Sequence, residues 1–503
     1  MSERRLYIIG IDAAPLWLLD ELRREYNLRG FGIFYDNGSM RNMNSVLPPM
    51  TGPAWPTIYT GLKPGGHGVP DFFRITRDYS KDIAYFDPES ARPFWYDLSK
   101  RGMRSLLVTP AMAVTLPKME GIDMITGFPL PPRFSSDELR RISDRHNFRG
   151  EVDGVEAGMK EGKVTLAHAS KEYVGSIGRR SDVSMELIER NDYDLSFVCF
   201  TETDRMQHFS LNDKGYREYI GPLYEKISEF LLWVEARARR ESAQVMIVSD
   251  HGAQPIREKF LLNAWLIKNG YAALKPKVLE GIRSSSQAKA AGGIKYSIRE
   301  RAMRSGLRKV YDRMPQRVRK AGRDILGSAL SGASGGDYTR IHDFDLDMRK
   351  TRAFASVSNG PVCTIFINDG RFSESTVKNS ERQRLKREIE SKLKNIRDSS
   401  GKRVIVDLFD GAEYYAGTKS FIPPDILAEA RPGCILDIFN YSDREEFMRP
   451  EQAKSGDHIR NGIFGATPYG KDMLSGKKNV DLTSINPIVL HYFGIARKQN
   501  KKV

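Results

Sequence analysis

The sequence predicts an α/β protein whose core is a doubly wound, mostly parallel β-sheet flanked by helices. Short apolar runs rich in β-branched residues alternate with helical patterns, which is the order that parallel strands and their crossover helices produce. The runs are apolar almost throughout, as expected of strands buried on both faces. Strands are expected at residues 6–12, 105–110, 194–201, 244–250, 362–368 and 434–439, and helices at residues 17–26, 220–239 and 381–397.

The composition fits a folded protein of this class. Apolar residues make up 40% of the 503 residues and there are 43 glycines, which excludes a disordered, collagen-like or coiled-coil chain. No run approaches the roughly 18 apolar residues that are needed to span a bilayer. The chain is long enough for two or three domains, or for one large α/β domain with insertions.

The first strand and the cysteines indicate a cytoplasmic protein. The apolar run that begins at Leu6 is interrupted by Asp12, and no small-residue cleavage site follows it. We therefore interpret the run as a strand and not as a signal peptide. Cys199, Cys363 and Cys434 each lie in an apolar, strand-like run, which favours buried structural thiols in a reducing compartment.

Most of the net charge of +15 is concentrated in one segment. Residues 283–323 hold 13 basic and two acidic side chains and so contribute +11. Apolar residues recur mostly four apart across residues 294–318, which predicts a basic amphipathic helix, or two helices broken within it. We therefore divide the chain into a first part of the core at residues 1–275 (with cap-like loops at about 112–180), a basic helical insertion or lid at residues 276–340, and a second part of the core at residues 341–503.

Three interpretations of the basic insertion stay open. It could be a lid that packs its apolar face onto the core. It could lie in the plane of an anionic membrane, giving a peripheral membrane contact through residues 283–323. It could also attract a polyanionic substrate or nucleic acid. Tyr296 and Tyr311 are the only aromatic residues of this segment, so we expect no specific nucleic-acid recognition.

Aspartate and histidine residues gather at the ends of the predicted strands. Asp12 and Asp250 end the first and fourth expected strands, and Asp204 follows the third. Ligands of such sheets bind beyond the carboxyl ends of the strands. Three histidines accompany aspartates in motifs at or after these strands, in the pairs Asp250 and His251, Asp204 and His208, and Asp457 and His458.

This combination predicts a metal centre. Mixed carboxylate and imidazole sets suit Zn²⁺ or Mn²⁺ better than Ca²⁺. Three aspartates and three histidines are about enough for two ions with positions left open for a substrate. Any one pair alone could be an ordinary loop pair, and Asp12 could simply cap a helix.

Thr51 is a candidate nucleophile. It stands just ahead of an expected short helix, in whose first turn Pro53 is well suited by its fixed φ. The free N–H groups and the positive end of a helix favour a bound phosphate. A threonine hydroxyl is a poor nucleophile unless a metal or a base activates it, and the alternative is a plain N-cap.

Six motifs follow one another between residues 10 and 464. They are Gly10-Ile-Asp12, residues 51–68, Thr203-Asp-Arg-Met-Gln-His208, Ser249-Asp-His-Gly252, residues 262–271 and Asp457-His-Ile-Arg-Asn-Gly-Ile-Phe464. In type and order they resemble those of the alkaline phosphatase superfamily. Within it, the chain is similar to the type I phosphodiesterase/nucleotide pyrophosphatase branch and its predicted cytoplasmic phosphohydrolase relatives. The long block at residues 51–68 is the most specific, and the basic insertion lies outside the resemblance.

The resemblance implies two sites for divalent ions, with Zn²⁺ expected and Mn²⁺ as the alternative. One ion would be held by Asp12, Thr51, Asp250 and His251, and the other by Asp204, His208 and His458. Two ions roughly 3.5–4 Å apart stabilise the attacking and leaving oxygens of an in-line displacement. The resemblance thus implies attack of Thr51 on phosphorus, followed by hydrolysis of a phosphothreonine intermediate.

The sequence departs from the family pattern in two places. The phosphate-binding Asn of nucleotide pyrophosphatases, a few residues after the motif His-Gly, is missing here, and Arg74 is a candidate replacement. Gln207 stands where Gly usually precedes the second-site histidine. His67 is expected to have a structural role in its turn, and Asp457 to orient the imidazole of its neighbour rather than bind an ion.

The function expected from these features is hydrolysis of a phosphodiester or pyrophosphate bond. The substrate would be a small phosphoester, such as a nucleotide or a nucleotide-sugar. The alternative within enzymes is a phosphomonoesterase or a phosphoglycerate-mutase-like phosphotransferase. The alternative outside enzymes is a non-catalytic protein that binds membranes or polyanions through the basic insertion.

Overall fold

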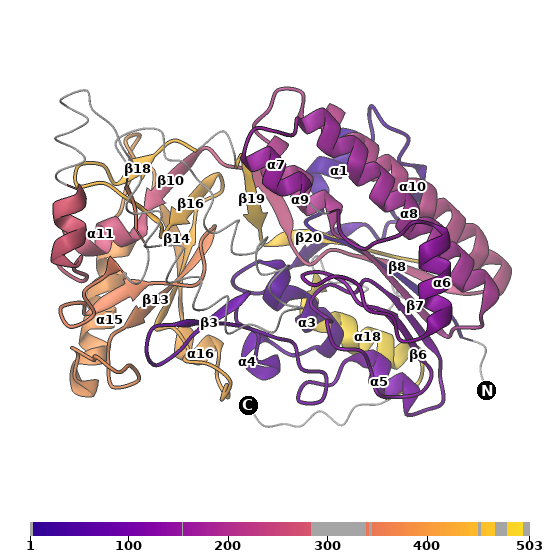
Figure 1. Ribbon diagram of the computed structural model, residues 1–503, viewed down its shortest axis with the longest axis horizontal. Helices are drawn as coiled ribbons and strands as arrows, with labels where there is room; N and C mark the ends of the chain where they lie inside the picture. Colours follow the sequence, from indigo (N-terminus) through magenta and orange to yellow (C-terminus); the bar gives the residue numbers. More distant parts are fainter. Residues whose placement is uncertain are drawn as a thin grey trace.

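A mixed, mostly parallel sheet of eight strands lies in the larger of two lobes, which sit side by side in the computed structural model (Figure 1). The structure describes residues 4–152, 154–282, 339–341, 345–450, 454–467 and 480–495. The strand order is β21-β2-β20-β8-β1-β7-β5-β6. The bounds are β1 Leu6–Ile11, β2 Arg41–Asn44, β5 Ser105–Val108, β6 Ile122–Ile125, β7 Leu195–Phe200, β8 Gln244–Val248, β20 Asn461–Ala466 and β21 Val480–Asp481.

Five neighbouring strands, β8-β1-β7-β5-β6, are parallel to one another. β20 is antiparallel to both of its neighbours, β8 and β2. The expected α/β fold with a mostly parallel sheet is therefore confirmed, and the first four expected strands lie in this sheet within two residues of their predicted ends.

Helices cover both faces of the sheet because its strands are apolar on both sides. Tyr7, Ile9 and Ile11 of β1 belong to one hydrophobic core, and Leu6 and Ile8 belong to the other. The first core is completed by α1 Leu16–Leu22, α2 Arg29–Asp36, α6 Asp137–Arg145, α7 Val155–Lys160, α8 Leu166–Arg190, α9 Glu202–Ser210 and α10 Tyr216–Glu241. The second is completed by α3 Thr51–Thr60, α5 Phe94–Ser99 and α18 Ile485–Tyr492.

The smaller lobe contains the last two expected strands, which do not join the parallel sheet. β13 is the second strand of an antiparallel sheet, β12-β13-β15-β14, and β16 belongs to the sheet β16-β10-β18. β13 is buried along its whole length, so its apolar run looks the same as that of a parallel strand. The bounds are β10 Glu258–Leu261, β12 Ala353–Ala355, β13 Val362–Ile367, β14 Ile405–Asp410, β15 Ile426–Ala430, β16 Cys434–Asp437, β18 Phe447–Met448, α11 Leu262–Lys268, α15 Asn379–Lys394 and α16 Gly411–Tyr414.

Short elements complete the described chain. They are α4 Pro64–His67, β3 Phe73–Ile75, β4 Lys81–Ile83, β9 Gly252–Pro255, β11 Thr339–Arg340, β17 Asn440–Tyr441, β19 Gly456–Ile459 and the 3₁₀ helix η2 Leu482–Ser484. β9 and β19 pair with each other beside the end of the large sheet. None of the helices in the described ranges has the length and apolar character required to cross a bilayer.

Some segments of the structure differ from those expected, others agree, and one lies outside the described residues. The stretch expected as cap-like loops contains α6, α7 and most of α8, and α8 packs along α10 (Figure 1). The helix expected at residues 17–26 ends earlier, at Leu22. Cys199, Cys363 and Cys434 are buried and form no disulfide. The basic amphipathic helix and the membrane contact expected at residues 283–323 lie outside the described residues.

Candidate metal centre

The carboxyl ends of three adjacent strands bring the predicted aspartates together. β1 lies between β7 and β8, and Asp12 directly follows β1. Asp250 comes two residues after β8, and Asp204 lies in the first turn of α9, just beyond β7. Parallel strands end at the same edge of a sheet, so three carboxylates that are far apart in sequence meet there.

The pairing of β9 with β19 brings His458 to the same place. His458 lies opposite Ala253 in this ladder, two residues after His251. The imidazole rings of His458 and His251 have centroids 4.1 Å apart, and those of His458 and His208 are 4.8 Å apart. A segment about 200 residues further along the chain thus completes the site.

Asp204, His208 and His458 form one group of mutually close ligand atoms. His458 Nε2 lies 3.2 Å from Asp204 Oδ1 and 3.1 Å from His208 Nε2, and His208 Nε2 lies 3.4 Å from the same Asp204 oxygen. The carbonyl of Gly456 accepts a hydrogen bond of 2.9 Å from His208 Nδ1. That bond fixes the proton on Nδ1, which leaves the Nε2 lone pair available to an ion.

Asp12, Asp250, His251 and Thr51 form the second group. His251 Nε2 lies 3.1 Å from Asp250 Oδ2 and 3.5 Å from Asp12 Oδ1. Thr51 Oγ1 lies 3.4 Å from Asp12 Oδ1 and 3.4 Å from His251 Nε2. His251 Nδ1 donates to the carbonyl of Gly252 at 3.1 Å, so its Nε2 is also the available nitrogen.

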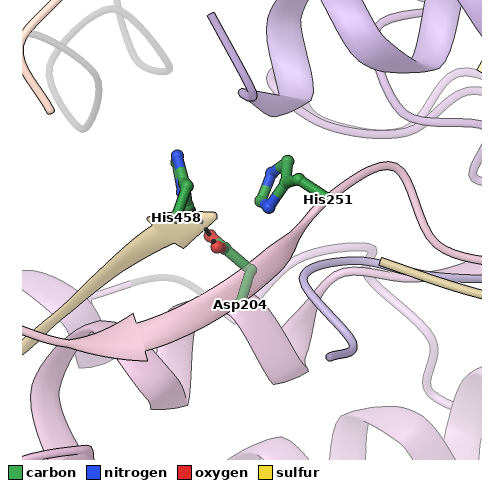
Figure 2. A group of neighbouring side chains, drawn as sticks. All are labelled: Asp204, His251 and His458. Carbon is green, nitrogen blue, oxygen red and sulfur yellow. Dashed lines mark ion pairs between the residues drawn. The ribbon is translucent and has the colours of Figure 1, made fainter. Parts of the chain in front are cut away.

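The two groups are continuous. Ligand atoms of Asp204, His251 and His458 lie within 4.8 Å of one another, as do those of Asp12, Asp250 and His251. Figure 2 shows Asp204 and the two imidazoles gathered between α9, the end of β19 and the loop after β8. His251 therefore lies between the two predicted ion sites.

A bound cation would stabilise the ionised forms of the buried aspartates in this centre. Burial, together with the carboxylates of Asp250 and Asp204, raises the pKa of Asp12 well above its usual range. Burial likewise raises the pKa of Asp250, to which Asp204 adds. Burial opposes the ionisation of Asp204, but the neighbouring His208 and His458 outweigh it and hold its pKa well below the usual value.

The residues present fit divalent ions of the zinc type. Among the described residues, the buried oxygens Asp204 Oδ1 and Asp250 Oδ2 have no hydrogen-bond partner. Each faces an imidazole Nε2. Buried carboxylates without donors, combined with imidazoles whose second nitrogen is already hydrogen-bonded, are the donor set of a zinc or manganese site.

Thr51 is the first residue of α3 and not its N-cap. The N-cap is Met50, and no side chain caps the first turn. Thr51 is only 4% exposed, and its hydroxyl faces Asp12 and His251 instead of the helix N–H groups. The plain N-cap alternative therefore does not describe Thr51.

Hydrogen bonds hold Asp12 and its turn in place. Trp55 Nε1 donates to Asp12 Oδ2 at 3.3 Å, and Thr203 Oγ1 donates to the Asp12 carbonyl at 2.5 Å. Gln207 Nε2 donates to the carbonyl of Ala13 at 2.8 Å. These roles were not predicted. Trp55 lies in the most specific motif, and Gln207 was noted only as a departure from the family pattern.

The other candidates lie near the centre or away from it. Arg74 donates to the backbone carbonyl of Ser420 at an exposed position, and no described contact joins it to Thr51. His67 is buried and bonded to Thr57 at 3.0 Å, and no candidate ligand group of the described chain includes it. Asp457 Oδ1 accepts a bond of 2.8 Å from the backbone N–H of His458, and its carboxylate also lies within reach of an ion held by His208 and His458.

Comparisons with known proteins identify the family and agree with the fold. A family model described as type I phosphodiesterase / nucleotide pyrophosphatase matches residues 6–331. A search among curated proteins finds no match. A structure of phosphonoacetate hydrolase from Sinorhizobium meliloti 1021 in complex with phosphonoacetate is similar at 13% identity and a TM-score of 0.56, covering 97% of this chain and 96% of that one. Murine ectonucleotide pyrophosphatase/phosphodiesterase 5 matches at 11% identity and a TM-score of 0.46, covering 98% and 96%.

Proposed function

Because the chain belongs to the type I phosphodiesterase/nucleotide pyrophosphatase family, and is thereby a metal-dependent phosphoester hydrolase, we propose that it cleaves phosphodiester or pyrophosphate bonds through a phosphothreonine intermediate at Thr51. We assign one ion to Asp12, Thr51, Asp250 and His251 and the other to Asp204, His208 and His458. Zn²⁺ is the expected ion at both sites, with Mn²⁺ as the alternative.

One observation carries this proposal more than any other. The Thr51 hydroxyl is buried within 3.4 Å of two predicted ligand atoms, Asp12 Oδ1 and His251 Nε2. It also stands at the start of a helix whose first turn has no side-chain cap. A phosphate placed against Thr51 would therefore meet free backbone N–H groups and the positive end of the helix dipole.

The proposed reaction has two steps, in which Thr51 is first phosphorylated and the phosphothreonine is then hydrolysed. When bound, the ions favour the ionised hydroxyl and stabilise negative charge on the leaving oxygen. Thr51 Oγ1 forms the new P–O bond, the bond to the leaving group breaks, and the leaving group departs as an alcohol or phosphate once protonated. A water molecule then attacks phosphorus, which returns the Thr51 hydroxyl and releases the phosphorylated product.

The proposal extends to the class of substrate and to the location of the protein in the cell. We propose a small phosphoester substrate, such as a nucleotide or nucleotide-sugar. The three unpaired, buried cysteines support a reducing, cytoplasmic environment.

The test compares bis-p-nitrophenyl phosphate with p-nitrophenyl phosphate, each with added Zn²⁺ or Mn²⁺. The proposal predicts a higher kcat/KM for the diester, and Thr51→Ala is expected to lower kcat by ~10³-fold or more because the nucleophile is gone. Thr60→Ala removes a hydroxyl from the same helix, where it bonds the Pro56 carbonyl, and should leave the activity unchanged. A clear preference for the monoester would instead favour a phosphomonoesterase or phosphotransferase, and full activity of Thr51→Ala would exclude Thr51 as the nucleophile.

A further inference from the structure

Four charged side chains surround the start of α9, the helix that carries Asp204 and His208. We call Arg180, Glu202, Glu151 and Arg205 the α9 charge cluster. Arg180 Nη1 lies 2.6 Å from Glu202 Oε2, and both side chains are almost completely buried, at 0% and 1% exposure. Arg180 Nη2 lies 3.6 Å from Glu151, and Arg205 Nη2 lies 3.1 Å from the other Glu151 oxygen.

The surroundings of the cluster are built to hold these charges. The Arg180 guanidinium lies 5.6 Å from the ring centroids of both Phe148 and Phe200. Glu202 also accepts a bond of 2.6 Å from the hydroxyl of Ser176 in α8. The Thr201 hydroxyl, at the N-cap of α9, donates to both Glu151 oxygens at 2.8 and 2.9 Å.

Stability alone does not account for such a cluster. Removing two charges from water costs several kcal/mol per ion, and apolar residues of similar volume often stabilise a fold as well or better. A fully buried Arg–Glu pair is therefore weak evidence for a stabilising role. Its place, at the first turn of the helix that carries Asp204 and His208, indicates a role in setting their geometry.

Contacts hold α9 on three of its faces, and the α9 charge cluster supplies the contacts on one of these faces. Residues three and four apart on a helix share a face. Thr203 and Gln207 bond the carbonyls of Asp12 and Ala13, and Asp204 and His208 face His458. The remaining face, with Glu202 and Arg205, is bound by the cluster to α8 and to the loop before α7. The cluster thus fixes the rotation and depth of the helix that presents two ligands of one ion.

We propose that the α9 charge cluster is a positioning device that sets the affinity of the second ion site, the one formed by Asp204, His208 and His458. This inference rests on the proposed function, because it assumes two ion sites. None of the four side chains belongs to a candidate ligand group of the described residues. They act through the position of α9; partners bonded directly to metal ligands change metal affinity by about 10–100-fold, and we expect the lower end of that range here.

The first test is a zinc titration of Glu202→Gln, which keeps the shape of the side chain and removes its charge. Ions bound per chain are measured after dialysis against buffers of stepped free Zn²⁺ concentration. The wild type should bind two ions, and the step that His208→Ala abolishes identifies the second site. In Glu202→Gln we expect that step to shift to at least ~10-fold higher free Zn²⁺, with the other step unchanged.

A matched control neutralises another buried carboxylate held by arginines. Asp425 is 1% exposed and lies 2.6 Å from both Arg371 and Arg382 in the smaller lobe. Asp425→Asn should leave both zinc steps where they are in the wild type. An equal shift in this variant would mean that any loss of a buried charge weakens the site, and it would overturn the proposal.

A second variant separates positioning from folding. The double variant Arg180→Met, Glu202→Leu removes both charges and leaves neither unpaired, so we expect it to fold with an unchanged circular dichroism spectrum. Its second zinc step should still shift, and its activity should recover when Zn²⁺ is raised above that step. If the second zinc step is unshifted in both variants, the proposed role of the α9 charge cluster is wrong. If the wild type binds fewer than two ions, the proposed function is wrong instead.

Discussion

Burial and neighbouring charges shift the pKa values of individual side chains in the centre. Asp12 and Asp250 have raised pKa values, and Asp204 outweighs burial to raise the pKa of His208. The structure brings these residues together at the strand ends and Asp-His pairs that can be read directly from the sequence. The sequence does not show that Thr51 is the first residue of α3 with its hydroxyl turned to the carboxylates, since that depends on how α3 packs against β1.

Zinc binding should therefore become stronger as the pH rises. An ion needs ionised Asp12 and Asp250 and neutral His208, so binding releases protons that the metal-free protein holds. The rise in Tm on adding Zn²⁺ over a chelated sample should be larger at pH 8 than at pH 6. Differential scanning calorimetry measures it, and an equal rise at both pH values would contradict the described electrostatics.

His67 should make the protein sensitive to mild acid. Burial lowers its pKa to about 3, against 6.5 for an exposed histidine. The unfolded chain therefore takes up a proton below pH 6.5 that the folded protein does not, so stability is lost as the pH falls through this range. Between pH 7 and pH 5 this loss is about 2 kcal/mol.

The measurement compares the free energy of unfolding of wild type and His67→Gln in urea at pH 7 and pH 5. The wild type should lose about 2 kcal/mol more than the variant over this interval. Identical losses would mean that His67 can be protonated in the folded protein.

At the level of elements, the centre depends on how closely α9 and β19 approach. The sequence predicts the first four strands well because their apolar runs are long and end in polar residues. It assigns β13 and β16 to the wrong sheet, because a strand that is covered on both faces is equally apolar in either sheet. The α9 charge cluster was also missed, because its members are spread over some 50 residues and resemble ordinary surface charges until the helices pack.

Gly456 permits the approach of β19 to α9. A Cβ atom at this position would lie 2.2 Å from the backbone oxygen of Gln207, a contact that can be relieved only if the backbone of α9 or β19 shifts. Gly456→Ala should therefore destabilise the protein by about 1–3 kcal/mol and weaken zinc binding, because it moves His458 away from Asp204 and His208.

Gly32→Ala is the control for that substitution. Gly32 lies within α2 and has no atom within 4 Å of the added Cβ, so alanine should raise stability by up to ~1 kcal/mol. Urea unfolding and zinc titration measure both variants. If Gly456→Ala has the same free energy of unfolding and the same zinc affinity as the wild type, the described packing of β19 against α9 is contradicted.

At the level of the whole molecule, two lobes meet beside the centre. Ser358, from the smaller lobe, donates to the buried Asp71 at 2.8 Å, and a Cβ added at Gly52, next to Thr51, would lie 3.1 Å from the Asp71 backbone. The fold class and the family follow from the strand pattern and from the order of the motifs. The smaller lobe as a separate set of mostly antiparallel sheets does not, because its pairings join segments up to about 190 residues apart and no local pattern records them.

We propose that remote segments of the chain fold together to hold two divalent ions around the Thr51 oxygen. The most direct measurement is an anomalous difference map from crystals of the protein grown with Zn²⁺. Two peaks are predicted, roughly 3.5–4 Å apart. One should be bounded by Asp12, Thr51, Asp250 and His251, and the other by Asp204, His208 and His458. A map with a single peak, or with peaks remote from Thr51, would contradict the account.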